Sequence, residues 1–238
     1  TEGLDAALAA AGAWDLARAS EALGIAPDAL QTFCDWFAAT ERTVTFYSQG
    51  INQSATGTDK CNAIINCHLA TGRIGREGMG PFSITGQPNA MGGREVGGLA
   101  NQLAAHMDFT PEAIARVGRF WGAPHMATAP GLKAVELFDA IERGDVKAVW
   151  IMATNPVVSL PDADRVRRAL ARCELVVVSD CIAHTDTAAC AHVLLPATGW
   201  GEKDGTVTNS ERRISRQRGV LGPPGEARHD WRIVCDVA

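Results

Sequence analysis

Three short apolar runs in the second half of the chain constrain its fold more than any other feature. They are Val146–Met152, Glu174–Val178 and Val193–Pro196. Helical patterns separate them, at Asp162–Ala171 and around Asp186–Ala191. Strands that are apolar along their whole length are typical of a parallel sheet that is covered on both faces. The alternation of strands and helices therefore predicts an α/β fold, with a doubly wound, mostly parallel sheet and helices on both faces.

The sequence before these strands predicts helices and one further strand. Residues 4–40 have helical spacing, and Pro27 opens a second helix within them. Arg42–Ser48 is rich in β-branched and aromatic residues, which favours a strand. Three more helices are predicted, over Gly57–Ala70, Thr110–Trp121 and Leu132–Arg143.

Residues 50–98 contain 11 of the 24 glycines of the chain. The centre of this segment, residues 72–97, is too irregular in sequence for a helix and too varied for a flexible linker. Glycine at this density suits a backbone that folds closely against a large ligand or another domain. A long structural loop is the alternative, although such loops are uncommon in compact domains unless they have a function.

The two ends of the chain indicate an excised segment of a longer protein. The chain opens at Thr1 without a methionine and closes within an apparent helix, Asp230–Ala238. We expect residues 1–42 to be a helical segment that continues from a preceding part of that protein. Residues 43–238 are expected to form the α/β domain.

Composition and charge argue against several classes of protein. Apolar residues make up 46% of the chain and charged residues 21%, so a buried core is expected rather than intrinsic disorder. The net charge of −5 argues against nucleic acid or an anionic membrane as the main partner. No apolar run approaches the roughly 20 residues that a membrane-spanning helix needs.

The seven cysteines do not form a metal-binding pattern. None belongs to a CxxC pair, and the nearest two are six residues apart. We expect reduced, partly buried thiols in a cytoplasmic protein, and no metal bound by this segment itself.

Polar residues follow each of the three predicted strands. Asn155 follows the first strand, and Ser179 and Asp180 end the second. Glu202 and Lys203 follow the third strand after a short loop. Ligands of open parallel sheets bind beyond the carboxyl ends of the strands, where an acid often binds ribose hydroxyls. The pattern favours a nucleotide site, although each residue alone could be a helix cap or a turn residue. No GxGxxG motif follows the first strand, so an ordinary nicotinamide or flavin site is not indicated.

Longer strings of residues resemble a known family. They include Gly50–Gln53, Asn66–Gly75, Gly80–Gly97, Thr154–Pro156 and Leu194–Arg213. These strings resemble the molybdopterin oxidoreductases, and Gly80–Gly97 in particular is similar to the bacterial assimilatory nitrate reductases. The resemblance covers nearly everything from about Thr43 onward. It implies a Rossmann-like domain that binds molybdopterin guanine dinucleotide.

The resemblance implies cofactors, a substrate and partners for the longer protein. Such enzymes hold molybdenum between two molybdopterin guanine dinucleotides and carry a [4Fe-4S] cluster, whose ligands lie outside this segment. The implied reaction is reduction of nitrate to nitrite by oxygen-atom transfer, with electrons from a donor protein or reductase subunit. This segment alone is expected to be inactive. The alternatives are a formate dehydrogenase of the same family and a non-catalytic scaffold subunit derived from it.

The resemblance also implies roles for individual residues. Gln49 and Gln53 match positions that approach the pterin and the molybdenum. The residues that match contacts to one guanine dinucleotide are Asn155, Ser179, Asp180, Lys203 and Asp230. Arg94 matches an arginine near the substrate channel, where its charge would attract nitrate. The alternative for Arg94 is a structural contact with its neighbour Glu95.

Overall fold

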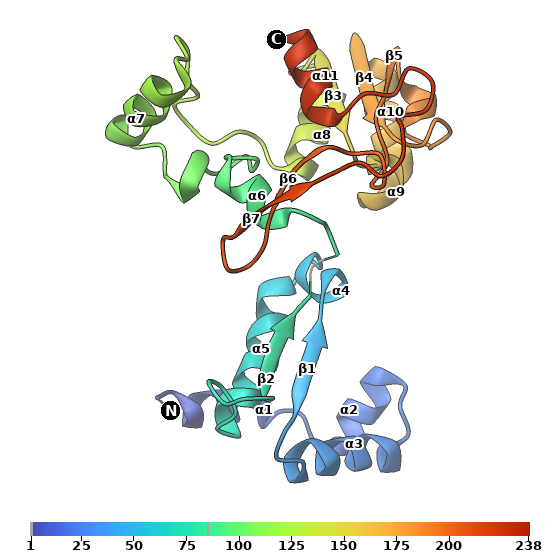
Figure 1. Ribbon diagram of the computed structural model, residues 1–238. Coiled ribbons are helices and arrows are strands. Elements are labelled where there is room, and N and C mark those ends of the chain that lie inside the picture. Colours follow the sequence, from blue (N-terminus) through green and yellow to red (C-terminus); the bar gives the residue numbers. More distant parts are fainter. Residues whose placement is uncertain (1, 85) are drawn as a thin grey trace. The chain divides into compact units, whose positions relative to one another are not determined.

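The computed structural model describes residues 2–84 and 86–238. The chain divides into two compact units, Thr1–Gln87 and Pro88–Ala238 (Figure 1). Both contain parallel strands flanked by helices, which confirms the predicted α/β class. The first unit combines the helical segment expected over residues 1–42 with the start of the expected α/β domain. The division of the longer protein into domains at residue 42 stays a prediction.

The first unit is built around two parallel strands. Its elements are α1 (Leu4–Ala11), α2 (Leu16–Leu23), α3 (Pro27–Ala39), β1 (Val44–Tyr47), α4 (Gln49–Asn52), α5 (Gly57–Ala70) and β2 (Gly80–Ser83). In the pair, Val44 lies opposite Gly80 and Tyr47 lies opposite Ser83. Because the two strands are parallel, their carboxyl ends lie at the same edge, next to α4.

A buried polar cluster joins the helices of this unit to β1. Arg73 is 4% exposed, and its guanidinium donates to the carbonyls of Phe37 at 2.5 Å and Thr40 at 2.7 Å. His68 is fully buried, with Nε2 2.8 Å from Thr45 Oγ1. Burial, and then the nearby charge of Arg73, lowers the pKa of His68. His68 therefore stays neutral in the folded protein at neutral pH.

The glycine-rich segment is more regular than its sequence indicates. It contains β2 and a short helix, α6 (Ala90–Glu95), so the expectation that residues 72–97 are too irregular for a helix is wrong over α6. Asn89 precedes α6 with a left-handed backbone, φ 61°. A Cβ on Gly92 would lie 2.0 Å from Asn89 Oδ1, so the asparagine side chain occupies the space that the glycine leaves.

The second unit contains the predicted parallel sheet. Its order is β3 (Ala148–Met152), β4 (Leu175–Asp180) and β5 (Val193–Pro196), all parallel. The elements beside it are α8 (Ala134–Arg143), α9 (Pro156–Ser159), α10 (Ala163–Arg172) and a 3₁₀ turn, η2 (Ala188–Cys190). The remaining elements are η1 (Ala104–His106), α7 (Pro111–Trp121), β6 (Gly205–Thr208), β7 (Ile214–Gln217) and α11 (Asp230–Val237). The strands β6 and β7 form an antiparallel hairpin.

The core of the second unit lies between the sheet and the helices α8 and α10. Ile141 of α8, Leu170 of α10 and Val176 of β4 are each at most 1% exposed and belong to one apolar cluster. Complete burial of a side chain such as Leu170 stabilises the fold by roughly 1.5–3 kcal/mol. This cluster fixes the strands, and with them the polar residues at their carboxyl ends.

Candidate functional site

The carboxyl ends of β3 and β4 bring together the polar residues that the sequence places after them. Met152 pairs with Ser179, and the Ala153 amide donates to the Ser179 carbonyl at 3.0 Å. Asn155 follows two residues later as the N-cap position of α9, at the edge of the sheet where β4 ends with Asp180. The register of the sheet therefore brings Asn155, Ser179 and Asp180 to the same edge.

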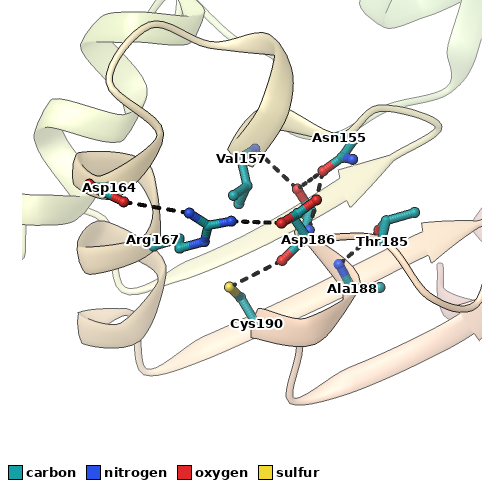
Figure 2. A network of polar contacts seen from close by, with 9 residues as sticks. Asn155, Val157, Asp164, Arg167, Thr185, Asp186, Ala188 and Cys190 are labelled. Atoms are coloured by element: carbon teal, nitrogen blue, oxygen red, sulfur yellow. Dashed lines mark hydrogen bonds and ion pairs between the residues drawn. The ribbon is translucent and has the colours of Figure 1, made fainter.

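Asn155 is held by a residue that is distant in sequence (Figure 2). Its Oδ1 accepts hydrogen bonds from the Thr187 backbone amide at 3.2 Å and from Thr187 Oγ1 at 2.6 Å. Thr187 Oγ1 in turn accepts from the Val157 amide at 3.2 Å. Thr187 is fully buried. Thr187 was not predicted as a site residue, because nothing in the sequence indicates that its side chain contacts the segment after β3.

Ser179 and Asp180 are adjacent but have different surroundings. The Ser179 side chain is buried, and its Oγ accepts from Trp150 Nε1 at 2.8 Å. Asp180 is half-buried, and its Oδ1 accepts from the Ile182 amide at 3.0 Å. Asp180 also lines a cavity of about 200 Å³ together with apolar residues that include Leu194. Asp180 thus offers a carboxylate to a ligand, whereas the Ser179 hydroxyl already has a partner.

Lys203 and Asp230 form an ion pair with each other, which the sequence did not indicate. Lys203 Nζ lies 2.5 Å from Asp230 Oδ2, and both side chains are about one-third exposed (28% and 33%). Asp230 is the first residue of α11, and the next residue, Trp231, donates from Nε1 to the Asp204 carbonyl at 2.9 Å. These contacts attach α11 to the segment that carries Lys203.

Gln49 and Gln53 lie at the two ends of α4, in the first unit. Gln49 Nε2 donates to Gln87 Oε1 at 3.1 Å, whereas Gln53 is exposed. Between them, Asn52 Nδ2 donates to Ser83 Oγ at 3.2 Å. The carboxyl ends of β1 and β2 therefore carry more polar groups than the sequence analysis named. If β2 had been predicted as a strand, Ser83 at its end and Gln87 after it would have been expected among the polar groups at this edge.

Arg94 and Glu95 do not pair with each other. Glu95 accepts a bidentate contact from Arg212, at 2.8 and 3.0 Å, and also lies 3.3 Å from His106 Nε2. The hydrogen bond from Arg212 is the main cause that lowers the pKa of Glu95. Arg94 is exposed and has no ion pair within residues 2–84 and 86–238. The structural alternative for Arg94, a contact with Glu95, is therefore wrong.

The arrangement at the end of the second sheet suits a nucleotide. Asn155 Nδ2 offers two N–H donors, and Asp180 offers a carboxylate oxygen to hydroxyl or amine donors. Lys203 offers a cation of the kind that binds phosphate, if its ammonium group binds the phosphate in addition to Asp230. Asn155 and Asp180 therefore provide donors and acceptors for a polar ligand, and Lys203, in the loop after β5, provides a positive charge in the same unit.

The described part of the chain contains no cluster of three or more His, Cys, Asp or Glu side chains that could hold a metal ion. All seven cysteines are free thiols in the structure. No helix among the described residues is both long and apolar enough to span a bilayer.

Comparison with known proteins identifies the family. Residues 10–238 match the sequence profile described as "Molybdopterin oxidoreductase". The chain belongs to the molybdopterin oxidoreductase family. This membership implies a molybdopterin cofactor with molybdenum, and the donor set around Asn155 and Asp180 is of the type that the nucleotide part of such a cofactor needs.

Relatives within the family are much longer than this chain. A nitrate reductase of Klebsiella oxytoca is 62% identical over 98% of this chain, which covers 27% of the relative. A nitrate reductase of Shewanella frigidimarina is 53% identical over 94% of the chain and 24% of the relative. The alpha subunit of an F420-dependent formate dehydrogenase of Methanocaldococcus jannaschii is 34% identical over 92% of the chain and 32% of the relative. The chain thus spans about a quarter to a third of these molybdopterin oxidoreductases.

Proposed function

We propose that the longer protein containing this chain is a molybdenum-dependent nitrate reductase, and that this chain is part of its cofactor-binding region. The observation that carries the proposal is the 62% identity to the Klebsiella oxytoca nitrate reductase over nearly the whole chain. Identity to the formate dehydrogenase subunit is much lower, at 34%. The polar groups at the end of the sheet also favour a cofactor-binding role over a scaffold without cofactor.

The proposed reaction consumes nitrate, two electrons and two protons, and produces nitrite and water. When bound, a molybdenum held by two molybdopterin guanine dinucleotides would supply the oxygen-atom transfer. A [4Fe-4S] cluster, with ligands outside this segment, would deliver electrons from a donor protein or reductase subunit. The contribution of this chain is to bind and orient the cofactor and to attract nitrate.

The proposed contacts follow from the type of each side chain. Asn155, Asp180, Lys203 and Asp230 would hold one guanine dinucleotide through hydrogen bonds and charge. Ser179 also belongs to the residues proposed to contact this dinucleotide, and its hydroxyl oxygen already accepts a hydrogen bond from Trp150 Nε1. The pterin and the molybdenum would be approached by Gln49 and Gln53. Arg94, an exposed cation without an ion pair in the described part of the chain, would attract nitrate.

We further propose an assimilatory role and a cytoplasmic location. The similarity of Gly80–Gly97 to assimilatory nitrate reductases supports the role. Seven cysteines without a disulfide support the location, because free thiols persist in reducing compartments.

The experiment that tests this function uses the full-length protein with a reduced dye as electron donor. We expect reduction of nitrate to nitrite, no oxidation of formate, and molybdenum and guanine in the purified enzyme. Formate oxidation without nitrate reduction would favour the formate dehydrogenase alternative. Absence of molybdenum, guanine and both activities would favour the scaffold.

A further inference from the structure

The orientation of the Asn155 amide is determined by the groups around it. The Thr187 backbone N–H can only donate a hydrogen bond, and it lies 3.2 Å from one polar atom of the Asn155 side chain. That atom must therefore be the carbonyl oxygen, Oδ1. The opposite orientation would place two N–H donors against the N–H of Thr187, with no acceptor between them.

The Thr187 hydroxyl reinforces this orientation. The Val157 amide donates to Thr187 Oγ1 at 3.2 Å, so the hydroxyl proton is free to bond the Asn155 Oδ1, 2.6 Å away. The three groups form a directed chain, from the Val157 N–H through the Thr187 O–H to the Asn155 carbonyl. Neighbouring hydrogen bonds in such a chain strengthen one another. Thr187 is fully buried, so water does not compete for its hydroxyl.

A further contact holds the segment that contains Thr187. Arg167 Nη2 of α10 lies 2.6 Å from Asp186 Oδ1, in an ion pair that Figure 2 marks with a dashed line, and Asp186 immediately precedes Thr187. The side chains of this pair are about half exposed, so the pair adds little stability by itself. It does connect the Thr187 backbone to a helix whose Leu170 is completely buried.

The remaining polar atom of Asn155 is Nδ2. Among the described residues it has no hydrogen-bond partner, and Asn155 follows the carboxyl end of β3, at the edge of the sheet where the parallel strand β4 ends with Asp180. We propose that Thr187 is a positioning residue, which holds the Asn155 amide so that its N–H donors face the bound nucleotide. Asn155 then binds an acceptor oxygen of that nucleotide, whereas Asp180 binds its donors. This inference rests on the cofactor part of the proposed function.

A merely structural role for Thr187 makes different predictions, and the same turn offers a matched control. Thr185 Oγ1 accepts from the Ala188 amide at 3.0 Å, so it supports η2, and its hydroxyl does not contact Asn155. Removing either hydroxyl deletes a local hydrogen bond. Only the loss of the Thr187 hydroxyl should release the Asn155 amide.

The experiment compares Thr187→Val, Thr187→Ser and Thr185→Val in the full-length enzyme. The measurement is the rate at which guanine nucleotide is lost during timed incubation and gel filtration, with the melting temperature of each variant recorded. Thr187→Val should lose guanine roughly three- to tenfold faster than the wild type, which corresponds to one hydrogen bond. Thr187→Ser should stay within about twofold of the wild type, because the hydroxyl is kept, and Thr185→Val should match the wild type.

A double-mutant cycle with Asn155→Ala separates positioning from general support. If Thr187 acts through Asn155, Thr187→Val should change the guanine loss rate little once Asn155 is alanine. Asn155→Asp retains an acceptor for Thr187 but replaces the Nδ2 donor with an acceptor, so it should lose guanine faster than Asn155→Ala. Equal effects of Thr187→Val in both backgrounds would overturn the inference. So would equal losses in Thr185→Val and Thr187→Val, or no effect of Thr187→Val.

Failure of the proposed activity is distinguishable in the same preparations. A wild-type enzyme that retains guanine and does not reduce nitrate would refute the activity and leave the Thr187 comparison intact. A wild-type enzyme without bound guanine nucleotide would overturn the inference about Thr187. An enzyme that reduces nitrate, with guanine loss unaffected by Thr187→Val, would contradict the inference alone.

Discussion

Arg94 and Lys203 are both proposed to act through positive charge, yet their surroundings differ. Lys203 shares its charge with Asp230 at 2.5 Å. Arg94 is exposed, and no carboxylate pairs with it in the described part of the chain, because Arg212 and His106 bind the adjacent Glu95. An unpaired cation attracts anions at longer range than a paired one. Arg94 is therefore the better candidate for attracting nitrate, and Lys203 for a fixed contact with phosphate.

In the full-length enzyme, Arg94→Ala should raise the KM for nitrate about three- to tenfold, with a smaller decrease in kcat. The reason is that an attraction of about 1 kcal/mol in water acts on capture rather than on the chemical step. Arg94→Lys should recover part of the effect, and higher ionic strength should narrow the difference from the wild type. Steady-state kinetics at two salt concentrations measure the rise in KM, its partial recovery in Arg94→Lys and its dependence on ionic strength. Arg213→Ala, another exposed arginine, is the control. An unchanged KM in Arg94→Ala would remove Arg94 from the site.

Asp230→Ala should lower the guanine and molybdenum content of the purified enzyme. It removes a charge-assisted contact to the nucleotide and leaves Lys203 without its partner, a loss of roughly 1.5–3 kcal/mol. Metal analysis and acid release of guanine measure the content. Asp236→Ala, at another acidic residue of α11, removes ion pairs with Arg228 and Arg232 and should leave the guanine and molybdenum contents unchanged. Full cofactor content in Asp230→Ala would count against the contact.

Among the elements, those with a clear apolar pattern could be predicted from sequence, and those without one could not. The sheet strands β3, β4 and β5 agree with the apolar runs to within about two residues. The strand β2 contains glycine and proline, and α6 begins after a left-handed Asn89, so neither shows the usual pattern. Their formation depends on pairing with β1 and on close packing at Gly92. The same limit applies to the site. The sequence predicts that Asn155 follows β3, but it does not predict that Thr187 hydrogen-bonds to Asn155.

Helix α5 should lose stability as the pH falls, because it carries the neutral, buried His68. The pKa of His68 is lowered in the folded protein, so below about pH 6.5 the unfolded state binds more protons than the folded state. Its stabilising contribution is therefore complete above that pH and is lost as the pH falls through the lowered pKa. Hydrogen-exchange protection factors of the α5 amides, compared between pH 7.5 and 5.5, measure this loss.

His68→Gln should weaken the pH dependence of α5, since the substituted side chain does not titrate in this range. His125→Gln, at an exposed histidine of the second unit, should leave it unchanged. Equal pH dependence of the α5 amides in wild type and His68→Gln would show that another group is responsible.

At the scale of the whole chain, large apolar side chains are exposed in both units. The most exposed include Phe120 (86%), Val220 (83%) and Trp36 (71%). Exposed apolar surface of this extent marks interaction sites or promotes association. The relatives are three to four times longer than this chain, so further protein is available to cover such surface in them.

Residues 1–238 expressed alone should therefore self-associate at concentrations where the full-length enzyme keeps a constant mass. Phe120→Ser and Val220→Ser should reduce this association, because they remove the two most exposed apolar side chains. Size-exclusion chromatography with light scattering gives the mass at each concentration. Arg119→Ser, beside Phe120 in α7, is the control. A segment that stays monomeric at all concentrations would contradict this expectation.

The sequential order of β3, β4 and β5 also has a consequence for folding during synthesis. All three strands lie within residues 148–196, so they can pair with one another before Arg228, whose amide donates to the Pro196 carbonyl at 3.0 Å, joins the end of β5. Asp230 follows Pro196 by 34 residues, roughly 2–7 s of translation at ordinary rates. Mixed α/β domains fold within milliseconds to about a second. We therefore expect Asn155 and Asp180 to be in place on a formed sheet before the residues that lead to α11 have emerged from the ribosome.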